Sequence, residues 1–350
     1  MKGAPEKILA ICSKYCTNSG DKEMTKEIME SFNENFLEFS AKGERVLGFC
    51  DKVISQDQYP LGVKIKETEN FPILNEMRFC GFIAMVDPPR NKVPDSIEKC
   101  KRAGIGVSMV TGDHQATAKA IAKKVGILSS KGPTVDELIR TGNEGQQNFE
   151  FSLLEFAKTN PDLDGLVLNG QNLDKMDDDQ LSLICKRFKE IVFSRTSPQQ
   201  KLRIVEAMQK NGYVTAVTGD GVNDAPALKK ANVGIAMGLS GTDVSKESAD
   251  MELMDDNFVS LVCGIEEGRL LFENLKKSIF YTLTSNVPEI VPILVSLIWQ
   301  TPMILGAIPV LFIDVGTDLL PAISFAYEKA ENDIMLQPPR NPKSETLVTP

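Results

Sequence analysis

The stretch Thr218-Gly-Asp-Gly-Val-Asn-Asp-Ala-Pro-Ala-Leu-Lys-Lys230 decides the fold, because it reads as a strand end, a turn and the start of a helix. The apolar, β-branched run over 213–217 before it is typical of a buried parallel strand. Two glycines within the stretch permit a tight turn, and Asn223 or Asp224 can cap a helix over 226–230. The pattern therefore predicts one strand–turn–helix unit of an α/β fold.

Two carboxylates of this stretch, Asp220 and Asp224, are expected at the carboxyl edge of the sheet, where open α/β folds bind their ligands. Hard oxygen ligands in that position suit a Mg²⁺ ion that also keeps waters and binds a phosphate. A capped turn with solvated acids is the alternative that this stretch alone leaves open.

Two further stretches repeat the strand–turn–helix pattern and favour the metal-site hypothesis. Ile105-Gly-Val-Ser-Met-Val-Thr-Gly-Asp113 ends in a hydroxyl, a glycine and an acid before an alanine-rich helix, whose N-terminus favours a phosphate. Ile191-Val-Phe-Ser-Arg-Thr-Ser-Pro-Gln-Gln-Lys201 ends a strand with Arg195 and places Lys201 early in the next helix. Three strand ends thus offer cations, acids and hydroxyls, which is what phosphoryl transfer requires for positioning and charge stabilisation.

Composition excludes several classes of protein. The 350 residues have room for two or three domains, and the formal net charge of −9 argues against nucleic acid as a partner. Seven cysteines without a paired CxxC motif indicate reduced thiols rather than a disulfide framework or a zinc site. His114 is the only histidine, which disfavours zinc hydrolases and Ser-His-Asp chemistry, and we assign it no separate role. The N-terminus shows no signal-peptide pattern.

The order of elements predicts a doubly wound parallel sheet after a mixed N-terminal region. Residues 1–79 are expected to hold helices over 7–14 and 25–39 and a strand over 45–52, and the polar segment 129–161 is expected to be a surface insertion. The strands of the parallel sheet are expected at 80–86, 105–110, 166–168, 190–194, 213–217, 232–236 and 250–254.

A long helix is expected from 258 to 281, and it leads into two apolar segments, 279–299 and 304–327. The first supplies about 21 positions, which at about 1.5 Å each is enough to cross the hydrocarbon core of a membrane. A buried soluble hairpin is the alternative, which the length of these segments and the five prolines in and between them disfavour. Lys276 and Lys277 before the first span and the charges after the second place both ends in the cytoplasm.

The acids inside this hairpin predict a cation site. Glu289, Asp314 and Asp318 each cost about 2.5–3.5 kcal/mol at mid-bilayer, so a functional reason for them is expected. Asn286 lies three residues before Glu289, and prolines nearby free backbone carbonyls one turn earlier. Because the hairpin contains no basic residue, these oxygens are expected to enclose an alkali cation rather than to form ion pairs.

Four motifs give the chain a family resemblance: Lys2-Gly-Ala-Pro-Glu6, Asp87-Pro-Pro-Arg90, Thr111-Gly-Asp-His114 and the run from Thr218 to Pro226. With them the chain resembles the P-type cation-transporting ATPases, whose phosphorylation domain belongs to the haloacid-dehalogenase superfamily. The resemblance narrows to the sodium/potassium and proton/potassium pump branch through Thr282-Leu-Thr-Ser-Asn-Val-Pro-Glu-Ile290, Ile313-Asp-Val-Gly-Thr-Asp318 and Pro339-Arg-Asn-Pro342. It covers nearly all of the sequence.

The resemblance implies an α/β fold with a haloacid-dehalogenase-like doubly wound parallel sheet, a partial α+β nucleotide-binding domain and a transmembrane helical hairpin. The implied parts are the C-terminal part of the nucleotide domain (1–79), the phosphorylation domain (80–257), a stalk helix (258–278), two transmembrane helices (279–299 and 304–327) and a cytoplasmic loop (328–350). We expect the chain to be a fragment or to start internally.

The resemblance also implies roles for single residues. Those expected around the phosphoryl group are Thr111, Gly112, Asp113, Lys201 and Asn223. Those expected to bind nucleotide are Lys2, Arg45 and Arg195, and those expected to hold Mg²⁺ are Asp220 and Asp224. The expected ligands of the transported cation are Ser285, Asn286, Glu289, Asp314 and Asp318.

The implied function is part of a pump that exchanges sodium for potassium in the plasma membrane, with ATP and Mg²⁺ as cofactors, membrane lipid around it and a β subunit bound through regions absent here. The aspartate that becomes phosphorylated lies in an Asp-Lys-Thr-Gly motif, which this sequence lacks, so the chain alone is expected to be inactive. The alternatives are a proton/potassium pump, which is expected to have a lysine in place of Ser285, a soluble phosphatase of the same superfamily, or an inactive remnant. A calcium pump fits the hairpin motifs less well.

Overall fold

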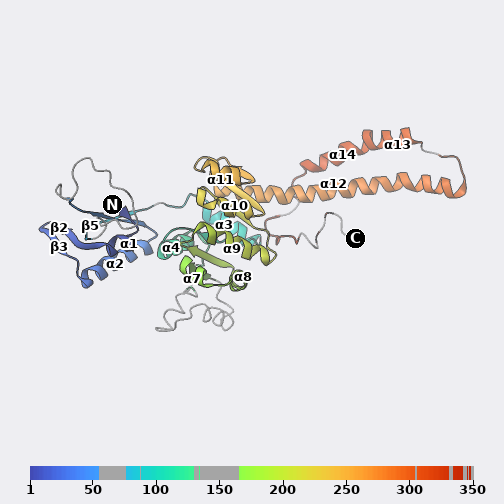
Figure 1. The fold of residues 1–350 in the computed structure, drawn as a ribbon. Coiled ribbons are helices and arrows are strands. Elements are labelled where there is room, and N and C mark those ends of the chain that lie inside the picture. Colours follow the sequence, from blue (N-terminus) through green and yellow to red (C-terminus); the bar gives the residue numbers. More distant parts are fainter. Residues whose placement is uncertain are drawn as a thin grey trace. The chain divides into compact units, whose positions relative to one another are not determined.

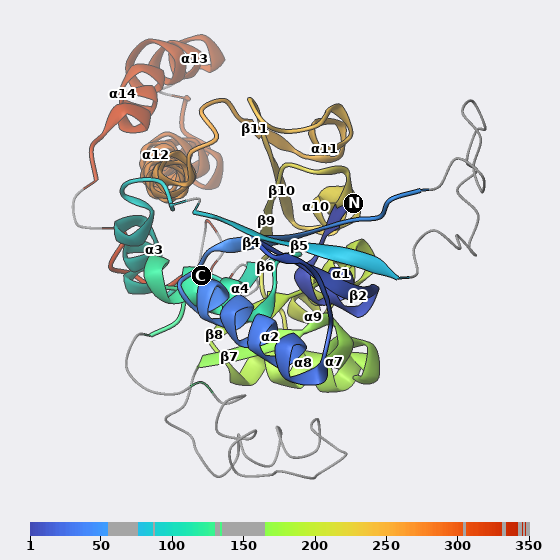
Figure 2. The same ribbon diagram turned by 90° about the vertical axis from the view of Figure 1, so that its left-hand side faces the viewer.

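The computed structural model describes residues 1–54, 76–86, 88–129, 134, 165–303, 306–330, 334–341, 345 and 347. Its contacts form two compact units, Met1–Pro94 with Val107–Glu252 and Asp95–Gly106 with Leu253–Pro350. Figure 1 shows the elements of each unit, and Figure 2 labels several strands that Figure 1 does not. The surface insertion expected over 129–161 lies almost entirely outside the described residues.

The N-terminal part of the first unit is a five-stranded sheet in the order β1-β4-β5-β2-β3. Its strands are β1 (Lys2–Gly3), β2 (Cys12–Thr17), β3 (Gly20–Glu23), β4 (Arg45–Asp51) and β5 (Met77–Met85). Helices α1 (Pro5–Ala10) and α2 (Lys26–Ala41) lie on the same side of this sheet in Figure 2. Ile8, Leu9 and Phe79 are almost fully buried and join α1 to the sheet, so apolar burial holds this part together.

This sheet corrects two sequence-based expectations. The strand expected over 80–86 in the parallel sheet is β5, which pairs antiparallel with β4 and parallel with β2. The helix expected over 7–14 ends at Ala10, and the β2–β3 hairpin follows it. Both strands of that hairpin are mostly polar and exposed, and therefore lack the alternation that marks a half-buried strand.

The rest of the first unit contains two three-stranded sheets, in the orders β6-β8-β7 and β11-β10-β9. Their strands are β6 (Met109–Val110), β7 (Gly165–Asn169), β8 (Glu190–Ser194), β9 (Ala216–Gly219), β10 (Val233–Met237) and β11 (Met251–Leu253). The pairs β6–β8, β7–β8 and β9–β10 are parallel. Parallel pairing and alternation with helices agree with the expected α/β class, but a single continuous sheet was expected, and among the described strands no pairing joins the two sheets.

Helices alternate with these strands, as the sequence predicts. They are α4 (Gln115–Val125), α7 (Gly170–Lys175), α8 (Asp178–Arg187), α9 (Pro198–Lys210), α10 (Ala225–Lys230) and α11 (Asp243–Ser248). The side chains of Leu166, Leu168, Ile191 and Phe193 are at most 1% exposed and form the core between β7, β8 and their helices. Strands that are buried on both faces read as continuous apolar runs, which is why 190–194 could be predicted.

The second unit is built on α12 (Phe258–Trp299), a 42-residue helix. It also contains most of α3 (Val93–Arg102), and α13 (Ala307–Ile313), a π-helical segment (Asp314–Asp318), α14 (Leu319–Ser324) and a 3-10 turn (Phe325–Tyr327) follow α12 along the chain. Lys99 of α3 binds Glu266 of α12 at 2.6 Å, and Arg269 donates to the Ala103 carbonyl at 3.0 Å. These contacts fix α3 against the polar end of α12.

Two helical segments of this unit, Phe258–Trp299 and Ala307–Tyr327, are long and apolar enough to cross a membrane. Their most apolar windows are only 11% and 0% buried, unlike the core helix of a soluble protein, which is mostly buried. Large exposed side chains, among them Phe280, Trp299 and Phe312, cover both segments. Such a surface is stable in lipid and costly in water, which favours the membrane interpretation of the hairpin.

Candidate functional site

The turn after β6 is held in place by the hydroxyl of Thr111. The Thr111 Oγ1 donates to the Asp113 carboxylate at 3.2 Å and accepts from the Asp113 N–H at 3.1 Å. The Thr111 N–H donates to the Phe193 carbonyl of β8 at 2.9 Å. Gly112 is exposed at the tip of this turn, so its N–H and the Asp113 carboxylate stand at the carboxyl edge of the sheet, as the sequence predicts.

The loop after β8 is bound to that turn. The N–H groups of Arg195 and Thr196 donate to the carbonyls of Asp113 and Thr111, at 3.1 and 3.2 Å. Arg195 has a φ of 53°, in the left-handed region. This conformation costs a side-chain-bearing residue about 1–2 kcal/mol, so the surrounding contacts must hold it. The structure thus brings Thr111, Asp113 and Arg195 into one hydrogen-bonded group.

Lys201, in α9, and Asp224, after β9, form an ion pair. The Lys201 Nζ lies 2.5 Å from the Asp224 Oδ1, and both side chains are less than one-fifth exposed. Asp224, one of the two residues expected to cap α10, is its N-cap residue, but its side chain accepts no capping hydrogen bond from the helix. The Asp224 carboxylate instead accepts from Lys201 through Oδ1 and from the Gly221 N–H through Oδ2. Lys201 needs a charged partner because its side chain is largely buried.

Asp220 is the carboxylate that remains available at this edge. Its backbone carbonyl accepts from the Thr242 N–H at 2.9 Å and from the Ser245 hydroxyl at 3.3 Å, which fixes its position. Its side chain is exposed and, within the described residues, makes no hydrogen bond or ion pair. Asn223 is exposed beside it. A rigid backbone with a free hard oxygen ligand fits a Mg²⁺ site of the kind that keeps most of its waters.

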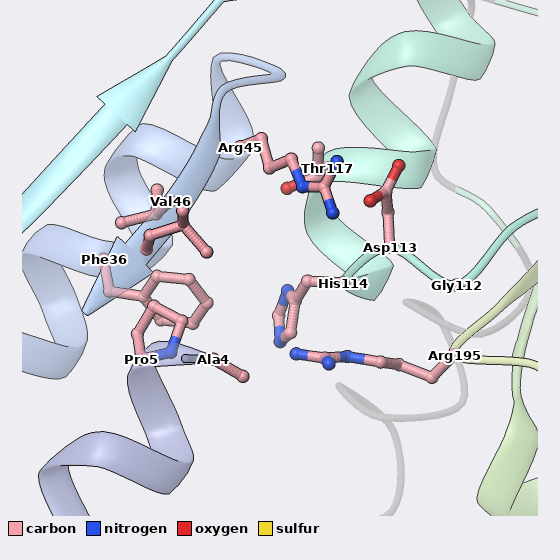
Figure 3. Close-up of a pocket in the computed structure, with 11 residues that line it drawn as sticks. Ala4, Pro5, Phe36, Arg45, Val46, Gly112, Asp113, His114, Thr117 and Arg195 are labelled. Carbon is pink, nitrogen blue, oxygen red and sulfur yellow. The ribbon is translucent and has the colours of Figure 1, made fainter. Parts of the chain in front are cut away.

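A pocket of about 170 Å³ opens in the first unit between the five-stranded sheet and the turn after β6. Arg45, His114 and Arg195 point into the same space in Figure 3. The Arg195 guanidinium also forms an ion pair with Glu6. Two cations fit a phosphate-bearing ligand, although the pocket is smaller than the roughly 300 Å³ at which ligand sites usually begin. Of the three expected nucleotide-binding residues, Arg45 and Arg195 line this pocket and Lys2 does not.

His114 sits at the centre of the pocket and caps α4, because its Nδ1 accepts from the Ala116 N–H at 3.3 Å. Its ring packs edge-on against Phe36, with ring centroids 5.0 Å apart. Burial lowers the pKa of His114 below its ordinary value, and the Arg195 charge acts in the same direction, although Glu6 opposes them. The neutral imidazole is therefore the form that this packing favours.

The pKa of His114 can be measured directly, since the chain has one histidine and its signals need no assignment among others. A folded pKa below the unfolded value of about 6.5 means that its contribution to stability is present above that pH and is lost as the pH falls through the folded pKa. We expect NMR titration of the imidazole to give a pKa below 6.5. We also expect His114→Gln to make the unfolding midpoint less sensitive to pH between 7 and 5. A pKa at or above 6.5 would contradict the buried neutral ring.

The hairpin of the second unit brings three acids together. The carboxylate oxygens of Glu289, Asp314 and Asp318 lie within 4.8 Å of one another. Asp314 and Asp318 begin and end the π-helical segment, whose wider turn aligns residues about four apart, and Gly316 lies between them. The Glu289 Oε1 is buried without a hydrogen-bond partner among the described residues. Three carboxylates this close repel one another unless a cation or protons lie between them.

The two uncharged residues that were expected to bind the cation, Ser285 and Asn286, make no contact with the three acids among the contacts of the described residues. The Ser285 hydroxyl donates to the Thr282 carbonyl at 3.0 Å, a bond within its own helix. Asn286 is half-buried one turn before Glu289 on α12, but no described contact joins it to the acids. Pro288 and Pro292 lie inside α12 without ending it, and each removes a backbone donor. The structure therefore brings together the three acids and leaves the two uncharged residues as expectations.

The sequence missed several residues around the pocket. Glu6 and His114 belong to recognised motifs, and their position there was a signal that they lie near the site. Phe36 and Thr117 line the same pocket and carry no such signal, because an aromatic residue and a threonine within helices are more often part of a core.

Comparisons with known proteins show which sequences this chain is similar to. The family model described as P-type ATPase, cytoplasmic domain N, matches residues 1–92, and that described as cation transporting ATPase, C-terminus, matches residues 302–350. The sodium/potassium-transporting ATPase subunit alpha-B of Artemia franciscana is 52% identical over 99% of this chain and 34% of its own length. The subunit alpha of Drosophila melanogaster is 53% identical over 99% and 33%, and that of Tetronarce californica is 52% identical over 99% and 33%. The chain spans about one third of the length of these relatives.

Proposed function

Since the chain belongs to the P-type cation-transporting ATPases, in the branch of the sodium/potassium-transporting alpha subunits, we propose that it is part of an ATP-driven pump that exchanges sodium for potassium across a membrane. The proposed cycle passes through an aspartyl phosphate, as the family resemblance implies. The nucleophilic aspartate is not among these 350 residues. The residues present would surround the phosphoryl group on that aspartate and bind the cations.

The cluster of Glu289, Asp314 and Asp318 is the observation that carries the proposal. Each acid is expensive within a membrane, and three in contact are stable only if their charge is balanced. A partly dehydrated alkali cation would supply that balance through carboxylate oxygens, with carbonyls freed by the prolines and the π-helical segment completing its shell. Ser285 and Asn286 are the proposed uncharged ligands from α12. A proton/potassium pump is disfavoured by Ser285, because the resemblance there expects a lysine.

The turns after β6 and β9 would bind the phosphoryl group. The Thr111 hydroxyl, the Gly112 N–H and the Asn223 amide are the proposed donors to its oxygens, with Asp113 fixing the Thr111 rotamer. Lys201 would stabilise the developing negative charge while Asp224 holds its ammonium in place. Charge stabilisation by preorganised groups of this kind is the main contribution of a protein to phosphoryl transfer.

ATP and Mg²⁺ are the proposed cofactors. Asp220 would bind Mg²⁺ directly, and Asp224, already paired with Lys201, would contribute through a bound water. When bound, the metal would neutralise charge on the phosphate oxygens. Arg45 and Arg195 are the proposed contacts to the nucleotide, with Lys2 at the edge of the same sheet. A haloacid-dehalogenase-like fold for the β6–β11 region is part of the same proposal.

The remaining assignments follow from the same proposal. The parts of the chain would be the nucleotide-binding portion (1–79), the phosphorylation domain (80–257), the stalk (258–278), the two spans and a cytoplasmic loop (328–350). The protein would lie in the plasma membrane with both ends of the hairpin in the cytoplasm. Sodium, potassium, lipid and a β subunit are the proposed partners.

The test of this function is to graft the sequence into a complete pump. We expect the isolated 350-residue chain in detergent to release no phosphate from ATP, since it lacks the Asp-Lys-Thr-Gly nucleophile. A chimaera in which these residues replace the matching third of the Drosophila alpha subunit should hydrolyse ATP only with sodium, potassium and Mg²⁺ together. A folded chimaera that hydrolyses ATP equally well without potassium would refute the proposed ion exchange. Turnover by the isolated chain that depends on Asp220 would mean that another residue is the nucleophile.

A further inference from the structure

The backbone at Arg195 fits against the start of α7 only because residue 170 is a glycine. A Cβ on Gly170 would lie well under 3.0 Å from the Arg195 carbonyl oxygen and 2.8 Å from the Gln200 Oε1, which real Cβ atoms essentially never do. Any side chain at position 170 must therefore push the Arg195 backbone away.

Gln200 joins the same segments by hydrogen bonds. Its Nε2 donates to the Gly170 carbonyl at 2.9 Å and to the Asp174 carboxylate at 2.6 Å, while its Oε1 accepts from the Ser197 N–H at 2.9 Å. The side chain is 7% exposed, so these bonds are shielded from water. One buried amide thus ties the loop that carries Arg195 to the start of α7.

Arg195 needs this support because its conformation is unfavourable. Its φ of 53° is rare for a residue with a side chain, and the bond from its N–H to Asp113 fixes only one side of the loop. Gly170 and Gln200 fix the other side. From this backbone the Arg195 side chain reaches the pocket that it shares with Arg45 and His114 (Figure 3).

We propose that Gly170 and Gln200 are positioning residues, which hold the backbone of Arg195 in its left-handed conformation and so direct the guanidinium into the nucleotide pocket. The inference rests on the proposed nucleotide-binding role of Arg195. Neither residue contacts the pocket itself, so each acts through Arg195. Strain that is held in place by neighbouring contacts is common where a side chain must be aimed at a ligand.

A double-mutant cycle tests this proposal in the 350-residue chain, with ATP as the probe and calorimetry as the measurement. Arg195→Ala should weaken ATP binding roughly tenfold, as the loss of one charge-assisted hydrogen bond does. Gly170→Ala should weaken it by a similar factor, and by less than about twofold when Arg195 is already alanine. Gly165→Ala in β7 is the matched control, because a Cβ there would meet Leu128 at an ordinary 3.5 Å.

A second measurement follows Arg195 without nucleotide. Its side chain is one-third exposed and paired with Glu6, so an arginine-selective dicarbonyl reagent should modify it slowly. Mass spectrometry should find severalfold faster modification in Gly170→Ala, with Arg102 as the internal reference and at a temperature where circular dichroism shows each variant folded. If Gly170→Ala does not fold, Gln200→Met should give the same change, because it keeps the side-chain length and removes the hydrogen bonds.

The outcomes are distinct. Faster Arg195 modification together with coupled losses of ATP affinity supports the proposal. Unchanged modification in both Gly170→Ala and Gln200→Met overturns it. If the unaltered chain binds no ATP and the modification rate still responds, the positioning role stands and the nucleotide-binding role of Arg195 falls.

Discussion

Asp220→Asn in the full-length chimaera is expected to abolish the acid-stable, Mg²⁺-dependent phosphoenzyme. Asp220 follows β9 and its carboxylate has no partner among the described residues, whereas Asp224 is paired with Lys201 at 2.5 Å. Its backbone is fixed through Thr242 and Ser245, so the amide would occupy the same place without the charge. Metal stabilisation of a phosphoryl group is worth several kcal/mol, so we expect a loss of roughly a hundredfold or more.

The measurement is the amount of radioactive phosphate retained after acid quenching of the chimaera supplied with labelled ATP. Asp179→Asn is the control, since Asp179 is an exposed aspartate of α8 whose ion pair with Lys210 lies on the surface. It should leave the phosphoenzyme at the level of the unaltered chimaera. Normal phosphoenzyme in the Asp220→Asn variant would show that Asp220 is not the metal ligand.

Asp314→Asn is expected to weaken potassium activation of ATP hydrolysis far more than it weakens ATP binding. Asp314 contributes one of three charges within 4.8 Å of one another. Removing it leaves an incomplete shell around the cation, and we expect the potassium concentration for half-maximal activity to rise at least about tenfold, or about 1.4 kcal/mol. ATP affinity should stay within about twofold, since Asp314 and the pocket that is proposed to bind ATP belong to different units of the chain and are expected to act independently.

Activity of the chimaera as a function of potassium, beside calorimetry with ATP, measures both quantities. Glu267→Gln is the matched control, because Glu267 is an exposed acid on the polar part of α12. Equal losses of potassium activation in the two variants would mean that a general effect of charge on the helix, rather than the carboxylate cluster, is responsible.

The sequence predicts this fold best where elements are long or uniformly apolar. The strands over 190–194 and 166–168 appear as β8 and β7, because each has a central run of three consecutive buried apolar residues, 191–193 and 166–168. The long helix through the first span is present as a single helix, α12, and its two prolines do not end it. In these elements the local sequence pattern agrees with the fold, so the pattern alone was enough to predict the element.

The sequence did not reveal which strands pair with each other. β5 was expected in the parallel sheet, but its partner β4 lies before it in the chain and pairs with it antiparallel. The helix expected over 7–14 ran into the first residues of β2, and the β2–β3 hairpin was not predicted, since its polar residues have no strand periodicity. Which strand pairs with which depends on contacts distant in sequence, and hydrophobic periodicity does not encode them.

In the candidate site, too, positions along the chain could be predicted and contacts between distant residues could not. The structure has Thr111, Asp113, Arg195 and Asp220 directly after β6, β8 and β9, where strand ends predict them, and Lys201 in α9, while their roles in a site stay predictions. The sequence did not distinguish Asp224, which is bound to Lys201, from Asp220, which has no such partner among the described residues. The left-handed Arg195 and its fit against Gly170 were also out of reach, because a close approach of two backbones depends on the folded chain.

Retention of rubidium-86, a radioactive substitute for potassium, by the full-length chimaera is the most direct test of the claim that the acidic hairpin holds the transported cation. Bound rubidium would be counted after rapid filtration, without ATP turnover. The unaltered chimaera and its Glu267→Gln control should retain rubidium, and potassium should displace it. Asp314→Asn should retain little at the same concentration while still binding ATP. If the Asp314→Asn variant retains rubidium with unchanged affinity, the hairpin is not the transport site and its three acids need a structural explanation.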